Sequence, residues 1–345
     1  MRPLLTGTFL TAIISMAVAP EAAAQSGKGV QVTRNDAAQH VDVTIDGQPF
    51  TSYMWPAAAK KPVLYPLRTA KGTLVTRGYP PRPGEPTDHP HHIGFWLNYG
   101  DVNGVDYWGN SEGLKPEERT KKGTIVHKAI KSTSGGATRG ELEVESDWVG
   151  PDGSVMLEET TRYIFHAPAG ERAIDRITTL KAQDERIVFA DTKEGMLGIR
   201  VARELQHPTK EEQTFTDASG NKETVKASGP STGAYISSEG KRGDDVWGTA
   251  ARWVMLQGKI GGEDITLAIL DHPSNPAHPT HWHARGYGLF AVNPFGVKDF
   301  SKGARTLNYA LEPGASLTFR HRVVILSAAA TPEQMDKRFE EFAKP

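Results

Sequence analysis

The sequence contains no cysteine among its 345 residues. This absence excludes disulfide bonds, thiolate metal sites, a lipid anchor on cysteine and a cysteine nucleophile. A serine nucleophile in elbow spacing, a phosphate-binding loop and a dinucleotide fingerprint are also missing. These absences argue against a serine hydrolase on an α/β fold, a nucleotide enzyme and a Rossmann oxidoreductase. Stability must instead come from a sizeable core, which a chain of this length can build.

Neither sign of charge is in excess. The formal net charge is -1, and no long run or stripe of basic residues is present. A nucleic-acid binder normally shows a basic patch, so we expect no nucleic-acid partner. The composition, with 38% hydrophobic and 8% aromatic residues, is that of a folded globular protein and excludes a disordered chain.

Long apolar runs occur only near the start of the chain. Arg2 is followed by a mostly apolar stretch at residues 4–18 and by three alanines at residues 22–24. This pattern predicts a signal peptide over residues 1–24 and one domain over residues 25–345. The apolar stretch is short for a bilayer-spanning helix, although an uncleaved anchor is the alternative. We therefore expect a periplasmic or secreted protein with no membrane segment after cleavage.

The rest of the chain has the period-two alternation of β-strands, and Asp46-Gly47 predicts a hairpin turn. The polar residues 210–229 are expected to form an exposed excursion. One helix is predicted after Thr331, with Gln334 completing a capping box. Together these features predict a mostly β protein, a large antiparallel β-supersandwich closed by a C-terminal helix. The strands are expected at residues 29–33, 40–45, 49–54, 62–67, 73–77, 141–149, 155–165, 173–180, 247–256, 264–270 and 316–326.

The most distinctive stretch is residues 88–96, DHPHHIGFW, which follows a stiff proline-rich loop. If the stretch is extended, His89 and His91 share a face and His92 points to the opposite side. Imidazoles are the commonest acid–base groups near neutral pH and the commonest metal ligands. Asp88 can orient one of them through its ring N–H. The alternative is a set of buried structural histidines.

A second histidine-rich stretch covers residues 278–288, HPTHWHARGYG. As a strand it would present His281, His283, Arg285 and Tyr287 on one face. Arg285 is a suitable clamp for a carboxylate or an oxyanion. A solvated outer face is the alternative. Our central hypothesis is that this stretch meets the first one in space and forms one polar site.

Further candidates lie between these two stretches. Trp96 and Trp108, with Asp106 beside the latter, have the composition of a sugar-binding surface, although tryptophans packed in a core explain them equally well. Glu194 and Arg200 would share a face of a strand. They either contact substrate or form a structural ion pair.

The chain resembles a bacterial family known as DUF6807, whose members carry the label "methane oxygenase PmoA". The matching residues are 62–66, 88–96, 103–108 and 278–290. The resemblance implies a β-supersandwich similar to the galactose-mutarotase group, and a setting of sugar utilisation in exported bacterial proteins. Many members of the family have Trp in place of His91 and some have Tyr in place of His281, so the resemblance implies firmer roles for His89, His92 and His283. A true methane monooxygenase subunit is an integral membrane protein, which this sequence does not resemble.

These observations favour an exported carbohydrate-active enzyme, a hydrolase, lyase or epimerase. The alternatives are a carbohydrate-binding protein without catalysis and a mononuclear metal oxygenase. A divalent metal, held by His89, His91 and His283, is left open as a cofactor. The expected catalytic residues are Asp88, His89, His92, His283 and Arg285. The expected substrate-binding residues are Trp96, Asp106, Trp108, Glu194, Arg200, His281 and Tyr287.

Overall fold

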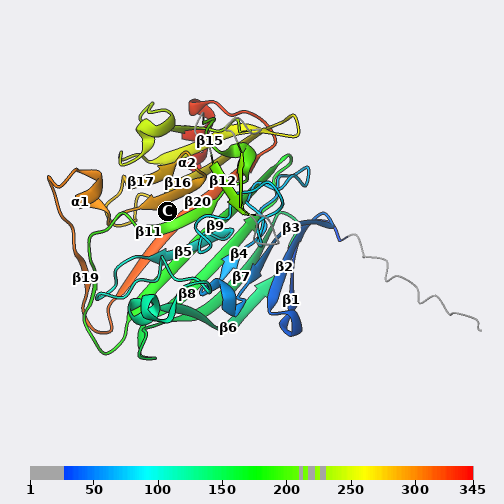
Figure 1. Cartoon of the computed structure of the whole chain (residues 1–345). Helices are drawn as coiled ribbons and strands as arrows, with labels where there is room; N and C mark the ends of the chain where they lie inside the picture. Colours follow the sequence, from blue (N-terminus) through cyan, green and yellow to red (C-terminus); the bar gives the residue numbers. More distant parts are fainter. Residues whose placement is uncertain (1–26, 210–212, 217–221, 226–230, 345) are drawn as a thin grey trace, which may run out of the picture.

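In the computed structural model the chain forms two large antiparallel sheets of eight strands each (Figure 1). The structure describes residues 27–209, 213–216, 222–225 and 231–344. In spatial order, the first sheet contains β1 (Val30–Asn35), β2 (His40–Ile45), β3 (Gln48–Met54), β4 (Val63–Leu64), β5 (Phe95–Tyr99), β11 (Gly195–Arg200), β18 (Leu289–Asn293) and β17 (His281–Arg285). The second contains β14 (Ala234–Ser237), β15 (Trp253–Ile260), β16 (Glu263–Asp271), β20 (Ser316–Leu326), β9 (Glu171–Ala182), β8 (Val155–His166), β7 (Arg139–Val149) and β6 (Thr124–Ser134).

The remaining elements are short, apart from the C-terminal helix. Two small two-stranded antiparallel sheets pair β10 (Ile187–Phe189) with β19 (Tyr309–Leu311) and β12 (Gln213–Thr216) with β13 (Lys222–Val225). The α-helices are α1 (Val297–Phe300) and α2 (Pro332–Phe342). The 3₁₀ turns are η1 (Asp36–Ala38), η2 (Ala57–Ala59), η3 (Pro116–Lys121), η4 (Arg203–Leu205) and η5 (Gly243–Val246).

The main core lies between the two sheets. Alternate residues of β7 are buried, among them Leu142, Val144 and Trp148, and they belong to one apolar cluster with Leu97 of β5 and Leu197 of β11. The alternation read from the sequence is therefore the pattern by which each sheet turns one face inward. The predicted fold class, a large antiparallel β-supersandwich with a C-terminal helix, is confirmed.

Helix α2 covers the outer face of the second sheet (Figure 1). Met335 and Phe339 pack in a second cluster with Trp253 of β15 and neighbouring side chains of β16. The capping box forms as predicted: the Thr331 hydroxyl accepts from the Gln334 N–H at 3.3 Å, and the Gln334 side chain accepts from the Thr331 N–H at 3.0 Å. This reciprocal capping sets where the helix begins.

Turn chemistry decided several strand boundaries. Asp46 and Gly47 both have positive φ, 51° and 75°, as a tight hairpin between β2 and β3 requires. Strands 40–45 and 316–326 occur at the expected boundaries. The strands expected at 62–67 and 73–77 are largely wrong: β4 has two residues, and the second segment makes only isolated bridges. Pro62 and Pro66 flank β4 and donate no backbone hydrogen bond, which limits the ladder there.

Two sequence expectations fall wholly or partly outside the described residues, namely the signal peptide at 1–24 and most of the excursion at 210–229. Within the described ranges, no helix is long and apolar enough to cross a membrane.

Four neighbouring strands of the first sheet bring the site segments together. β5, β11, β18 and β17 lie side by side, and side chains of the loop before β5, of the residues before β11 and of β17 line one cavity over these strands. Gly198 of β11 lies opposite Trp96 in this ladder, and a Cβ there would lie 2.7 Å from the indole. The glycine therefore gives Trp96 room to lie across β11.

Candidate functional site

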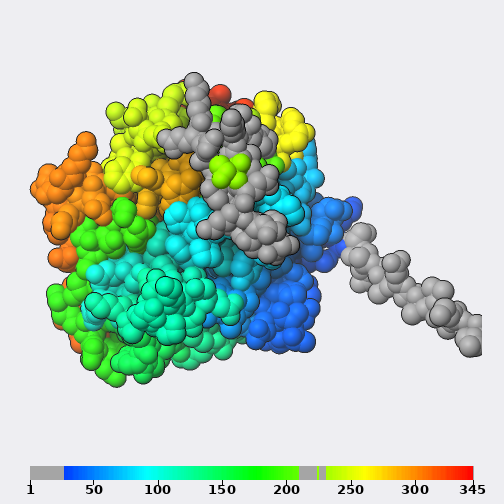
Figure 2. Space-filling model, in the orientation of Figure 1, coloured from blue at the N-terminus to red at the C-terminus, as the bar shows by residue number. Residues whose placement is uncertain are grey.

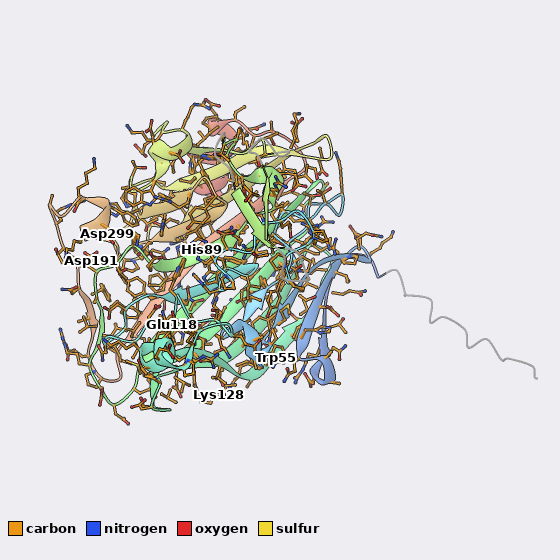
Figure 3. The ribbon with its side chains drawn as sticks, viewed as in Figure 1. Trp55, His89, Glu118, Lys128, Asp191 and Asp299 are labelled. Atoms are coloured by element: carbon orange, nitrogen blue, oxygen red, sulfur yellow. The ribbon has the colours of Figure 1, made fainter. Side chains whose placement is uncertain are left out.

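One cavity of about 430 Å³ collects side chains from both histidine-rich stretches. Figure 3 shows His89 near the middle of the face seen, and Figure 2 shows the cyan and orange segments, which are far apart in sequence, side by side on this face. The central hypothesis that the two stretches meet is thus confirmed. The lining residues are His89, His91, His92, Asp106, Trp108, Gly109, Lys193, Glu194, His283, Arg285 and Tyr287.

The first histidine stretch is a turn and not the extended segment expected. The His92 N–H donates to the His89 carbonyl at 2.9 Å, and His89 has a φ of 48°. The chain reversal brings His92 onto the same side as His89, with ring centroids 4.9 Å apart and nearly parallel planes. The expectation that His92 points to the opposite side is therefore wrong. A left-handed histidine is uncommon, and such residues cluster at functional sites.

These rings belong to a stacked column that runs from the cavity into the core. Tyr287 stacks on His89 at 4.9 Å, His89 on His92 at 4.9 Å, and His92 on Trp96 at 5.2 Å. Trp96 is fully buried, and its indole N–H donates to the Asn98 side chain at 3.0 Å. The column joins the two histidine stretches and holds the imidazole of His89 in place by packing.

Asp88 lies behind His89 and fixes its tautomer. The carboxylate accepts from the buried Arg200 guanidinium at 2.7 Å and from Arg77 at 3.3 Å, and its other oxygen accepts from Nδ1 of His89. The contacts with His89 and Arg200 outweigh desolvation and hold the pKa of Asp88 well below its usual range. Because the carboxylate only accepts hydrogen bonds, Nδ1 of His89 is the donor in this contact and Nε2 is left to meet a ligand. The side chain of His89 is 40% exposed, so this nitrogen can serve a ligand.

Arg77, which the sequence did not mark as a site residue, organises the whole turn. Its guanidinium donates to the carbonyl oxygens of Pro86, Asp88, His89 and His92 at 2.6–3.1 Å. The side chain is only 3% exposed. One buried cation therefore satisfies the backbone of a turn that has little regular hydrogen bonding of its own.

His283 is fixed in a different way. Its Nδ1 donates to the Lys193 carbonyl at 2.8 Å, which leaves the lone pair on Nε2. Burial lowers the pKa of His283 to about 4, against the opposing charge of Glu194. The cavity therefore holds one imidazole backed by a carboxylate and another that is neutral and backed by a carbonyl.

The two carboxylates that line the cavity are each paired with a lysine. Asp106 accepts from Lys122 at 2.5 Å and from the Gly109 N–H at 2.8 Å. Glu194 accepts from Lys193 at 2.6 Å. The alternative of a structural ion pair between Glu194 and Arg200 is wrong, because Glu194 precedes β11 and Arg200 pairs with Asp88. Tyr287 keeps its proton, since burial raises its pKa to about 12.

Three predicted binding residues do not line the cavity. Trp96 and Arg200 are fully buried beneath it, where they support His92 and Asp88. His281 stacks on Phe300 at 5.5 Å, because β17 begins there and its first residue lies away from the turn that holds His89. His92 lines the cavity but is 2% exposed, and neither ring nitrogen has a hydrogen-bond partner among the described residues.

A buried lysine lies beneath the remaining histidine. Lys61 donates to the His91 carbonyl at 2.7 Å and lies over the Trp96 ring, and burial lowers its pKa to about 7. Burial and the nearby cations lower the pKa of His91 to about 3. Within the described part of the chain, no three His, Asp or Glu side chains are grouped so that they could hold a metal ion. The set His89, His91 and His283 is therefore not assembled as metal ligands here.

We expect the free energy of unfolding to fall as the pH is lowered from about 6.5 to 4. His91, His92 and His283 have lowered pKa values in the folded state, so unfolding takes up protons in this range and acid favours the unfolded chain. Each such histidine contributes a slope of up to about 1.4 kcal/mol per pH unit. Urea unfolding at several pH values measures the free energy of unfolding, and His283→Gln should make it depend less steeply on pH. An equal slope in that variant would contradict the buried, neutral state of His283.

The fold and the cavity together define a β-supersandwich protein with a histidine-lined polar site on one of its sheets. A family model described as a family of unknown function, DUF6807, matches residues 40–340, so the chain belongs to that family. A search of curated proteins finds no match.

Several solved structures are similar at low sequence identity. The GH36 alpha-galactosidase AgaB of Geobacillus stearothermophilus is 14% identical with a TM-score of 0.41, covering 86% of this chain and 40% of that one. The Slr1438 protein of Synechocystis is 9% identical with a TM-score of 0.36, covering 90% and 100%. A galactose mutarotase related enzyme of Lactobacillus acidophilus is 9% identical with a TM-score of 0.34, covering 86% and 97%. This chain thus spans less than half of the alpha-galactosidase.

Proposed function

We propose that this protein is a carbohydrate-active enzyme that transfers a proton at a sugar carbon, as a lyase or an epimerase does. The observation that carries the proposal is the pair of differently supported imidazoles in one cavity, His89 on the Asp88 carboxylate and His283 on a backbone carbonyl. Environments that separate the protonation behaviour of two groups are how one site supplies both an acid and a base.

The assignment of roles follows from these partners. The Asp88 carboxylate orients the His89 ring through Nδ1 and directs Nε2 toward the cavity, so we assign His89 the role of proton donor. The neutral His283, with its Nε2 lone pair, is the proton acceptor. His92, whose nitrogens are buried, supports His89 by stacking. A glycoside hydrolase normally needs two carboxyl groups at the bond, whereas Asp106 and Glu194 are each neutralised by a lysine.

The lining favours a sugar as the ligand. Trp108 and Tyr287 offer aromatic surface, and Asp106, Glu194 and Lys193 offer hydrogen-bonding groups around it. Aromatic faces pack on the apolar face of a sugar ring while polar groups bind its hydroxyls.

We also propose that the protein acts outside the cytoplasm after removal of residues 1–24, which N-terminal sequencing of the exported protein would test.

The test is incubation in D₂O with a panel of sugars, glycosides, sugar acids and unsaturated sugars, read by mass spectrometry. We expect one class to gain deuterium or to be converted, and His89→Gln and His283→Gln to lose at least about 100-fold of the rate. Chelator is added in parallel. Activity lost with chelator would replace acid–base catalysis by metal catalysis, and binding without exchange or conversion would make the protein a carbohydrate-binding protein.

A further inference from the structure

A second cavity of about 510 Å³ adjoins the histidine-lined one. Both cavities are lined by Arg285 and Tyr287, so these two side chains form the boundary between them. The far side of the second cavity is formed by His207, Asp244 and Trp247. Each cavity alone has the size of a small-molecule site, and a ligand crossing the boundary would occupy both.

Arg285 carries a charge at this boundary that no anion neutralises. Among the described residues it has no ion pair and no side-chain hydrogen bond, and it is exposed. Its guanidinium lies over the rings of Trp247 at 5.6 Å and Tyr287 at 6.0 Å. Of the nearby carboxylates, Asp88 pairs with Arg200 and Glu194 with Lys193, while Asp244 is 85% exposed to solvent and contacts His207 at 3.3 Å. A guanidinium held by aromatic faces and left without an anion is suited to bind a carboxylate.

The second cavity also has unused polar groups. The indole nitrogen of Trp247 and Nε2 of His207 are buried and have no hydrogen-bond partner among the described residues. His207 is held by Asp244 through Nδ1 at 3.3 Å, and Gly286 leaves space for its ring, since a Cβ there would lie 3.1 Å from it. Buried polar atoms without partners are rare in folded proteins, so such a pair in one cavity points to a ligand.

Trp247 connects the two cavities. Its ring contacts the His283 ring edge to face at 6.4 Å and carries Arg285 on its face. A group packed on Trp247 would therefore lie next to the unit that His283 reaches.

We propose that the substrate is an acidic saccharide of at least two units. The reacting unit lies in the histidine-lined cavity, the next unit packs on Trp247 in the second cavity, and Arg285 binds the carboxylate at their junction. This inference rests on the proposed function in taking the ligand to be a sugar, and it adds the ligand's length and charge.

The experiment is calorimetric binding to the inactive His89→Gln variant, which requires no turnover. The probes are glucuronate, galacturonate and mannuronate, each as the monosaccharide and as the disaccharide, with the matching neutral sugars. We expect one acidic disaccharide to bind at least tenfold more tightly than its monosaccharide and than the neutral disaccharide. Trp247→Ala should weaken disaccharide binding at least tenfold more than monosaccharide binding and so remove the preference for the disaccharide. Arg285→Gln should remove the preference for the acid.

Control variants separate these effects from a loss of folding. Trp247→Phe keeps an aromatic face and should retain the preference for the disaccharide. Trp55→Ala and Arg186→Gln remove the same residue types outside both cavities and should change no affinity. Equal binding of acid and neutral sugars, equal loss of mono- and disaccharide in Trp247→Ala, or no binding of any probe would overturn the inference. If the acidic disaccharide binds as expected but is never converted, the proposed catalysis fails and the inference on the ligand stands.

Discussion

Asp88→Asn is expected to lower the turnover of the enzyme by roughly 1,000-fold and to destabilise the fold by about 2–3 kcal/mol. Both effects arise from the lost carboxylate. Arg200 is fully buried, and Asp88 is its ion-pair partner in the described structure. The amide would leave this cation uncompensated, although the 37% exposure of Asp88 lets water screen part of the cost. It would also remove the carboxylate that orients the His89 ring through Nδ1. Urea unfolding and initial rates on the substrate found in the panel measure the two losses.

His89→Gln is the matched control for this change. The ion pair between Arg200 and Asp88 remains in that variant, and the partly exposed His89 contributes less to the core than its neighbours. We therefore expect a comparable loss of turnover with a loss of stability below about 1 kcal/mol. Asp88→Asn with unchanged turnover would show that the carboxylate only neutralises Arg200, and it would remove His89 from the proposed chemistry.

The sheets could be predicted from the sequence because the signals involved are local. Alternation along residues 316–326 reproduces β20, and the Thr331 to Gln334 spacing reproduces the start of α2. In each case neighbouring residues alone decide the geometry, through the period of the strand or the capping of free N–H groups. The two-residue β4 was overestimated because flanking prolines outweigh the apolar character of that segment.

The meeting of the two histidine stretches could be predicted from their composition, but their internal geometry could not. The turn at His89 depends on contacts with Arg77, a residue that is distant from the stretch and carries no motif. The same holds for Arg200: strand periodicity offered Glu194 as one alternative partner, whereas the structure pairs Arg200 with Asp88. A buried guanidinium chooses its partner by the tertiary structure around it, since desolvation makes any unpaired position costly.

The second cavity could not be predicted from the sequence either. Trp247 and His207 come from unrelated segments with no distinctive spacing, and neither was predicted as a site residue. Strand β17, which places Arg285 and the following turn between the two cavities, links Trp247 and His207 to the histidine stretches.

Arg77→Met is the change for which we expect the largest loss of stability, about 3–5 kcal/mol, because methionine fills the space without donating hydrogen bonds. It would remove the Arg77 donors from four carbonyl oxygens of the turn, of which the His89 oxygen keeps its bond from the His92 N–H, and would remove the second cation beside Asp88.

Without these bonds we expect His89 to leave the left-handed region of backbone conformation. The stack with Tyr287 should then be lost, together with activity. Thermal unfolding measures the first effect, and the near-ultraviolet circular dichroism of the aromatic column measures the second. Arg77→Lys is the control: it keeps the charge but not the forked donors, so we expect it to fall between wild type and Arg77→Met. A cost below about 1 kcal/mol for Arg77→Met would mean that the turn is held by its own backbone and by packing, and Arg77 would then have no part in positioning His89.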